Sequence, residues 1–75
     1  MIDNKYFTFE NGIIRVKISA DMLHRPMSEI YEIEYLLNEI LPESCFTEVI
    51  DGSMYFIDPY GDKYPIDENF DTKIY

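Results

Sequence analysis

Few residues of this chain are suited to nucleophilic catalysis, which needs an activated group with a base beside it. Cys45 is the only cysteine and His24 the only histidine, so they form the only such pair. Their spacing matches no catalytic signature, and alternation along a predicted strand turns Cys45 toward the core. A lone histidine in a connecting segment is typical of a surface residue. We therefore assign no catalytic residue and expect a protein that is not an enzyme.

Carboxylates are the remaining groups that could bind a metal or transfer protons. Those near the last predicted turn lack the ligand order of a calcium-binding EF-hand loop. The chain has 15 acids, so proton-transfer pairs are too numerous for any one pair to be informative. Each of the three glycines fits a turn, and none belongs to a phosphate-binding loop. The carboxylates considered as metal ligands near this turn are Asp58, Asp62, Asp67, Glu68 and Asp71. We expect no metal site and no cofactor.

The clearest feature of the sequence is an uneven negative charge. The formal net charge is −9, divided into +1 over residues 1–25 (four bases, three acids), −9 over residues 26–62 and −1 over residues 63–75. No Lys or Arg lies between Arg25 and Lys63. Basic surfaces are the natural electrostatic partners of such a stretch. We predict that it binds a partner through Glu29, Glu32, Glu34, Glu39, Glu43, Glu48, Asp51, Asp58 and Asp62.

The charge also excludes some classes of partner. Contacts to phosphates need Lys and Arg, so direct nucleic-acid binding is not expected, and an anionic membrane surface would repel the chain. No apolar run approaches the roughly 18 residues of a membrane span, and the first residues do not resemble a signal peptide. A single cysteine is consistent with a reducing compartment. We expect a cytoplasmic protein with one domain, residues 1–75.

One amphipathic helix is predicted over Met27–Leu41, because its apolar residues recur on one side at about 100° per residue. Ser28 is the expected N-cap, with Glu29 and Glu32 in the first turn. Pro42 is the expected stop, since the residue before a proline avoids the helical region. The apolar residues of the helix are Ile30, Ile33, Leu37, Ile40 and Leu41.

Glu34 departs from this amphipathic pattern because it falls at the edge of the apolar side. It is either a carboxylate that reaches solvent from the rim of the core or a partly buried acid kept for a partner or for catalysis. No base on the predicted helix can pair with it, or with the other acids of the helix.

Two alternating segments, Lys5–Glu10 and Ile13–Ser19, flank Asn11-Gly12 and predict a β-hairpin with a type I′ turn. A two-residue loop fixes the register. Phe7, Phe9, Ile14, Val16 and Ile18 then form an apolar face, and Tyr6 lies on the solvent face. The predicted pairs are Phe9 with Ile14, Phe7 with Val16, Thr8 with Arg15 and Tyr6 with Lys17.

Three more strands are predicted after the helix: Ser44–Ile50, Ser53–Asp58 and Asp62–Ile66. Turns at residues 51–52 and 58–61 join them. Pro65 lacks an amide donor, so the last of these strands is expected at an edge. Residues 67–75 are either a loose tail or a last extended segment pinned by Phe70. The predicted pairs are Val49 with Met54, Thr47 with Phe56, Phe56 with Tyr64 and Met54 with Ile66.

The order β-β-α-β-β-β predicts an α+β fold, a small antiparallel sheet with one amphipathic helix packed on one face. The strands after the helix are apolar on both faces, and one helix covers only one of them. The tail, a second copy or a partner must cover the other. Aromatic and apolar residues predicted to contact a partner are Tyr31, Tyr35, Phe46, Ile50, Tyr55, Ile57 and Tyr60.

Three functions remain open. The first is a small acidic binding protein that docks on a basic protein surface, such as a nucleic-acid-binding protein or nuclease, and inhibits it as a DNA mimic. By size and charge alone, it is comparable with small inhibitors that phages and mobile elements use against restriction or CRISPR nucleases. The second is a homodimeric structural or assembly module closed through the exposed apolar sheet face. The third is a toxin-neutralising antidote.

Overall fold

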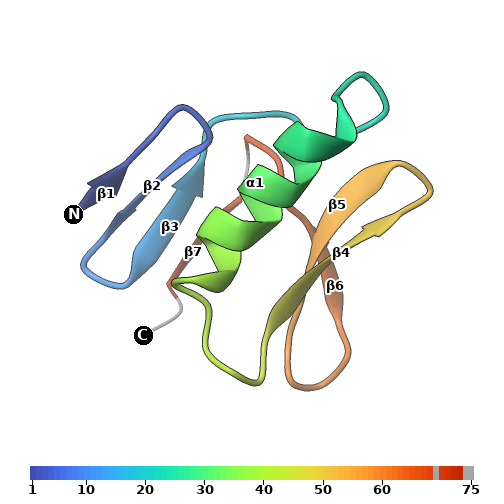
Figure 1. Ribbon diagram of the computed structural model, residues 1–75. Helices are drawn as coiled ribbons and strands as arrows, with labels where there is room; N and C mark the ends of the chain where they lie inside the picture. Colours follow the sequence, from blue (N-terminus) through green and yellow to red (C-terminus); the bar gives the residue numbers. More distant parts are fainter. Residues whose placement is uncertain (69, 74–75) are drawn as a thin grey trace.

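The computed structural model describes residues 1–68 and 70–73. The predicted α+β class, with antiparallel strands and one helix, is confirmed in this part of the chain. A short strand that was not predicted precedes the first hairpin, and another lies in the C-terminal segment for which an extended conformation was one alternative (Figure 1). The elements are β1 (Ile2–Asp3), β2 (Phe7–Glu10), β3 (Ile13–Val16), α1 (Met27–Asn38), β4 (Phe46–Ile50), β5 (Ser53–Ile57), β6 (Lys63–Pro65) and β7 (Asp71–Lys73).

The strands form two sheets where a single sheet was expected. The first has the order β1-β2-β3-β7 and the second the order β4-β5-β6, with antiparallel neighbours throughout. The C-terminal segment joins the first sheet, and the amide of Val16 donates to the carbonyl of Phe70 at 3.2 Å. Phe70 is buried, so the pinned segment, and not the loose tail, is the correct alternative for residues 70–73. Residues 69, 74 and 75 of the predicted tail lie outside the described residues.

The predicted type I′ turn at Asn11-Gly12 and the predicted tight turn at Asp51-Gly52 are both confirmed. The φ angles are 54° and 78° at Asn11 and Gly12, and 51° and 81° at Asp51 and Gly52. Positive φ at both central positions matches the twist of the flanking strands and so fixes the register. The predicted strand pairs follow, with two exceptions that lie beyond the strand ends. There one amide-to-carbonyl bond joins each pair, Lys17 to Tyr6 at 2.8 Å and Ile66 to Met54 at 3.0 Å.

Helix α1 begins where predicted but ends at Asn38, three residues before Leu41. Beyond Asn38, the amides of Ile40 and Leu41 both donate to the carbonyl of Leu37, so the chain tightens into a turn before Pro42. The N-cap is Pro26, with extended backbone and no side-chain bond, and the prediction of Ser28 as N-cap was wrong. Glu32 consequently lies beyond the first turn.

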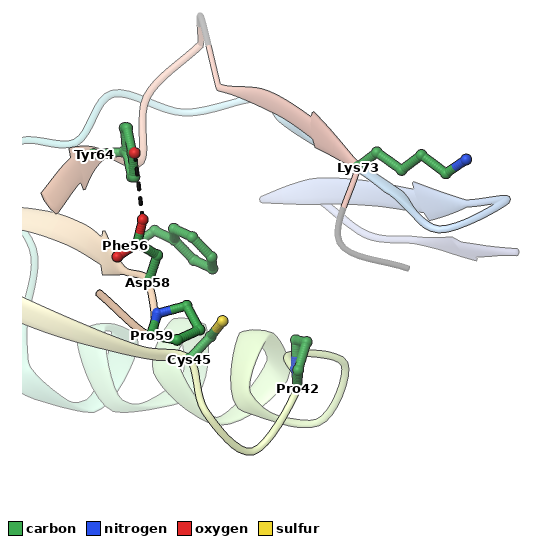
Figure 2. A pocket seen from close by; sticks show the side chains of 7 residues that line it. All are labelled: Pro42, Cys45, Phe56, Asp58, Pro59, Tyr64 and Lys73. Atoms are coloured by element: carbon green, nitrogen blue, oxygen red, sulfur yellow. Dashed lines mark hydrogen bonds between the residues drawn. The ribbon is translucent and has the colours of Figure 1, made fainter. Parts of the chain in front are cut away.

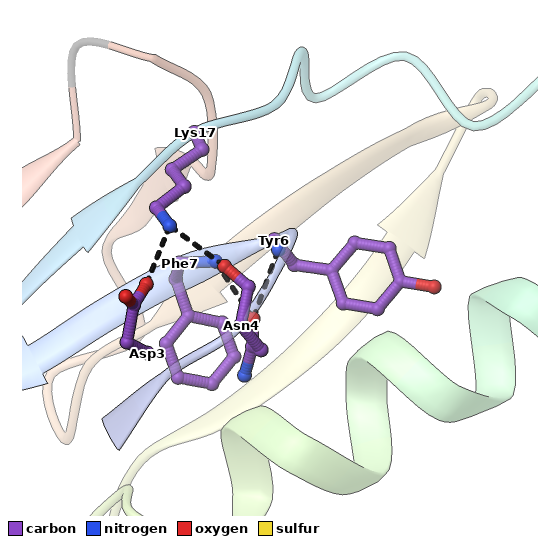
Figure 3. A network of polar contacts seen from close by, with 5 residues as sticks. All are labelled: Asp3, Asn4, Tyr6, Phe7 and Lys17. Atoms are coloured by element: carbon purple, nitrogen blue, oxygen red, sulfur yellow. Dashed lines mark hydrogen bonds and ion pairs between the residues drawn. The ribbon is translucent and has the colours of Figure 1, made fainter.

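Tyr6 is buried, although alternation placed it on the solvent face. The cause is Asn4, whose Oδ1 accepts the amides of both Tyr6 and Phe7 at 2.9 Å (Figure 3). This turn takes Tyr6 out of the strand, which begins only at Phe7. Tyr6 and Phe7 therefore both reach the interior, and Figure 3 shows the Tyr6 ring directed toward the helix. Lys17 holds the same loop through Asp3 and the Asn4 carbonyl, at 2.6 and 2.8 Å.

A single hydrophobic cluster joins the two sheets and the helix. Helix α1 contributes Ile30, Ile33 and Leu37, and Figure 1 shows it lying across the junction between the sheets. Full burial of each such side chain stabilises the fold by about 1.5–3 kcal/mol relative to exposure. The other buried residues of the cluster are Tyr6, Phe7, Ile14, Val16, Met22, Ile40, Met54, Phe56, Ile66 and Phe70.

The segment between β3 and α1 ties the two sheets together. The amide of Met22 donates to the carbonyl of Gly52 at 2.8 Å, and the amide of Met54 donates to the carbonyl of Ala20 at 2.9 Å. The exposed side chain of Leu23 then lies over Gly52, where a Cβ would be only 2.6 Å from Leu23 Cδ2.

We predict that Gly52→Ala destabilises the protein more than Gly61→Ala. Both glycines have positive φ, 81° and 85°, a conformation that costs an L-residue about 1–2 kcal/mol. Only Gly52 has a neighbour in the way, since nothing lies within 4 Å of a Cβ at Gly61. In urea unfolding, Gly52→Ala should lose more free energy of unfolding than Gly61→Ala. The difference should stay below about 1 kcal/mol, because the Leu23 side chain can move. In a Leu23→Ala background that extra loss should vanish, and its persistence would contradict this explanation.

Candidate protein-binding surfaces

The outer side of α1 presents two tyrosines beside two glutamates. The side chains of Tyr31 and Tyr35 are 62% and 65% exposed, and Glu32 and Glu39 beside them are also exposed. Residues four apart on a helix are neighbours, so the two rings lie along one stripe. We call Tyr31, Glu32, Tyr35 and Glu39 the acidic helix face.

Tyrosine hydroxyls hold both carboxylates of this face. The hydroxyl of Tyr6, which precedes β2, donates to Glu32 Oε2 at a distance of 3.2 Å. A hydrogen bond to Glu39, together with the charge of that carboxylate, raises the pKa of Tyr35. Lys5 Nζ lies 5.1 Å from the centre of the Tyr6 ring, and contact with Tyr6, followed by the charge of Glu32, raises the pKa of Lys5. The donors to these two carboxylates are thus neutral hydroxyls.

Most ion pairs of the described residues lie away from the acidic stretch. Arg15 pairs with Asp71 at 3.3 Å and Lys17 with Asp3 at 2.6 Å, and both acids are outside residues 26–62. Glu29 is the exception, because Arg25 in the turn before the helix reaches it. The expectation that no acid of the predicted helix has a nearby base is therefore wrong for Glu29. Within the described chain, the other eight predicted acids form no salt bridge.

Glu34 is half-buried, and burial raises the pKa of its carboxyl. It forms no ion pair among the residues that the structure describes. The side chain therefore stands half-buried at the rim of the core without a salt bridge in the described chain, a position that fits both alternatives for this residue.

The remaining predicted acids do not join the acidic helix face. Glu43 follows the helix, Glu48 lies on β4, and Asp51 occupies the turn at one end of β5. Asp58 and Asp62 occupy the turn at the other end of β5. Asp58 Oδ1 accepts the amides of residues 60 and 62 at 2.9 Å, so this carboxylate shapes its own turn.

The predicted aromatic and apolar contacts divide between two places besides the helix. Phe46 is 50% exposed on β4, while Ile50 and Tyr55 are half-buried on the same sheet. Ile57 is buried, so its predicted exposure was wrong, yet it does not belong to the main hydrophobic cluster. Tyr60 is 89% exposed at the tip of the last turn.

Cys45 lines an open pocket of about 430 Å³ between the second sheet and the end of β7 (Figure 2). His24 lies before α1 and Cys45 after it, and the helix between them has 12 residues and a length of roughly 18 Å. The sequence did not suggest this pocket, because Lys73 reaches it only through the pairing of β7 with β3. The other lining residues are Pro42, Phe56, Asp58, Pro59 and Tyr64.

Neither a metal centre nor a membrane-crossing helix is found in residues 1–68 and 70–73. No three His, Cys, Asp or Glu residues of this part are grouped to hold a metal ion. Its helix is too short and too polar to cross a membrane. Comparison of the chain with protein-family models, curated proteins and solved structures found no match.

We predict that Glu34→Gln stabilises the protein at neutral pH by about a few tenths of a kcal/mol, since the group keeps some solvent. Burial raises the pKa of Glu34 above the ordinary 4.5. At a pH above this raised pKa, the charged carboxylate therefore destabilises the folded state. As pH falls through it, the folded protein takes up a proton first and the penalty disappears. The gain from Glu34→Gln should therefore shrink at acidic pH.

Urea unfolding of Glu34→Gln and wild type over this pH range provides the measurement. Glu43→Gln is the matched control, because this substitution removes the same charge at an exposed position. An equal gain in both variants would attribute the effect to net charge and not to the burial of Glu34.

Proposed function

We propose that this protein is a small, non-enzymatic acidic binding protein of the cytoplasm that docks on a basic protein surface through its acidic helix face. The favoured targets are nucleic-acid-binding proteins, nucleases included, whose grooves carry Lys and Arg for phosphates. One observation carries the proposal: two exposed aromatic rings lie beside two carboxylates that no cation of the described chain pairs with.

The composition of this face suits a protein interface. Tyrosine is enriched among the residues that dominate binding energy, because a large ring is buried with little loss of freedom. Glu32 and Glu39 supply charge complementary to a basic groove, which favours the correct partner and speeds its encounter. Their hydrogen bonds to Tyr6 and Tyr35 restrict them before binding, so less freedom is lost on docking.

An inhibitory role follows from where such a protein would bind. A basic groove that binds phosphates attracts a chain of net charge −9. The range of this attraction is the Debye length, which the salt concentration sets. Once the acidic helix face occupies the groove, nucleic acid cannot enter it. Binding should therefore compete with duplex DNA, which is the behaviour of a DNA mimic.

We predict that Glu32→Gln combined with Glu39→Gln weakens binding to such a target about tenfold. Glutamine removes the charge but keeps an oxygen that accepts the hydroxyls of Tyr6 and Tyr35, so the fold should be unchanged. The measurement is titration calorimetry against a panel of purified basic nucleases and DNA-binding domains, at low and high ionic strength, with duplex DNA as competitor.

The matched control is Glu10→Gln with Glu68→Gln, which changes the net charge equally at two exposed positions off this face. Its affinity should stay within about twofold of wild type. Equal losses in the two double variants would contradict a role for the helix face, and binding that does not weaken with salt would contradict the electrostatic mechanism.

We further predict that Tyr31→Ser with Tyr35→Ser lowers affinity for the same target by at least about 2 kcal/mol. Both rings are largely exposed, so thermal unfolding should shift little. Tyr60→Ser removes an equally exposed ring at a distant turn and serves as the control. If the Tyr60 variant loses as much affinity, the tyrosines of the helix are not the anchors.

A further inference from the structure

The second sheet has a face directed away from the core, which we call the outer sheet face. Thr47, Met54 and Phe56 point into the interior, and alternation turns their strand neighbours the other way. Cross-strand pairing aligns these neighbours in two rows over β4, β5 and β6. The rows are Phe46, Ile57 and Lys63, and Glu48, Tyr55 and Pro65.

No described part of the tail covers this face. Residues 71–73 pair with β3 in the first sheet, and α1 packs on the core side of the second (Figure 1). Phe46 is half exposed and Pro65 exposed. Ile57 is buried outside the main cluster, between its cross-strand neighbours Phe46 and Lys63. The apolar surface left facing solvent therefore consists of Phe46, Pro65 and part of Tyr55.

The charges of this face distinguish it from the rest of the molecule. It carries one acid, Glu48 on β4, and one base, Lys63 on β6, at opposite edges of the sheet. Neither forms an ion pair within the described chain. The face is locally neutral on a protein of net charge −9.

We propose that the outer sheet face binds the same face of a second copy, forming a symmetric homodimer. A two-fold axis in the interface places Glu48 opposite the partner's Lys63 and, by symmetry, Lys63 opposite the partner's Glu48. Phe46, Tyr55 and Pro65 pack between these two pairs. A locally neutral, self-complementary surface fits a second copy better than the strongly basic partner of the helix face.

The dimer is weak, because the face is small. Three strands about 4.8 Å apart, of which β4 and β5 have five residues and β6 has three, give a footprint of at most roughly 14 by 17 Å at about 3.3 Å per residue. Stable interfaces bury about 800 Å² on each partner. Self-association is therefore concentration-dependent, and sedimentation velocity up to millimolar protein is the method that detects it.

A charge reversal tests the arrangement. Glu48→Lys should weaken self-association about tenfold, because symmetry creates two like-charge contacts. This result is diagnostic, since the substitution also lowers the overall repulsion between two acidic chains. Glu48→Lys with Lys63→Glu should restore wild-type association to within about threefold, because both pairs re-form with opposite polarity.

Control variants separate this proposal from the proposed function. Glu43→Lys makes the same charge change off the face and should strengthen association slightly. Tyr31→Ser with Tyr35→Ser should leave it unchanged, whereas Phe46→Ser should abolish it. Added salt screens both the two ion pairs and the overall repulsion between acidic chains, so it should change the dimer much less than it weakens binding of a basic target. A monomer at every concentration, or a dimer that ignores the reversal of Glu48, would overturn the proposal whatever the helix face binds.

Discussion

The fold depends on one helix that is shared by two small sheets. The inner faces of both sheets pack on this helix, and the only cysteine, Cys45, allows no disulfide within the chain. The side chains of Ile30, Ile33 and Leu37 meet both sheets in one cluster, so removal of the helix would expose the inner faces of both. Because its inner side is committed in this way, the outer side of α1 can vary freely, and this is where the exposed tyrosines and glutamates occur.

The distribution of bases explains why the acidity persists on the surface. Arg15 and Lys17 pair with acids of the first sheet, and Arg25 pairs with Glu29 at the start of the helix. Surface pairs of this kind contribute at most about 1 kcal/mol each, so they serve local geometry more than overall stability. What matters for binding is their position, since none of them reaches Glu32 or Glu39. Folding has thus left both carboxylates without a salt bridge in the described chain, although Lys5 lies close enough to Glu32 for the two charges to interact.

The sequence was informative wherever structure is local. Asn11-Gly12 and Asp51-Gly52 dictate their turns, and the turns dictate the register of two hairpins. It was uninformative about pairing between distant segments, because alternation is the same whichever strand lies alongside; the docking of residues 70–73 on β3 is such a case. The burial of Tyr6 was not predicted, because its amide donates to the side chain of Asn4 and the residue does not follow the alternation of the strand. Ile57 escaped because its burial depends on its two cross-strand neighbours.

The same limit applies to the candidate sites. The acids of residues 26–62 are close in sequence, yet the fold distributes them over the helix, both turns of the second sheet and its outer face. Net charge therefore did not define a single surface, and only the helical period grouped carboxylates with tyrosines. The fold also separates a charged surface on α1 from a neutral one beyond β4–β6. If the neutral surfaces pair, each dimer carries two acidic helix faces, and a target with two basic sites would be held far more tightly than by either face alone.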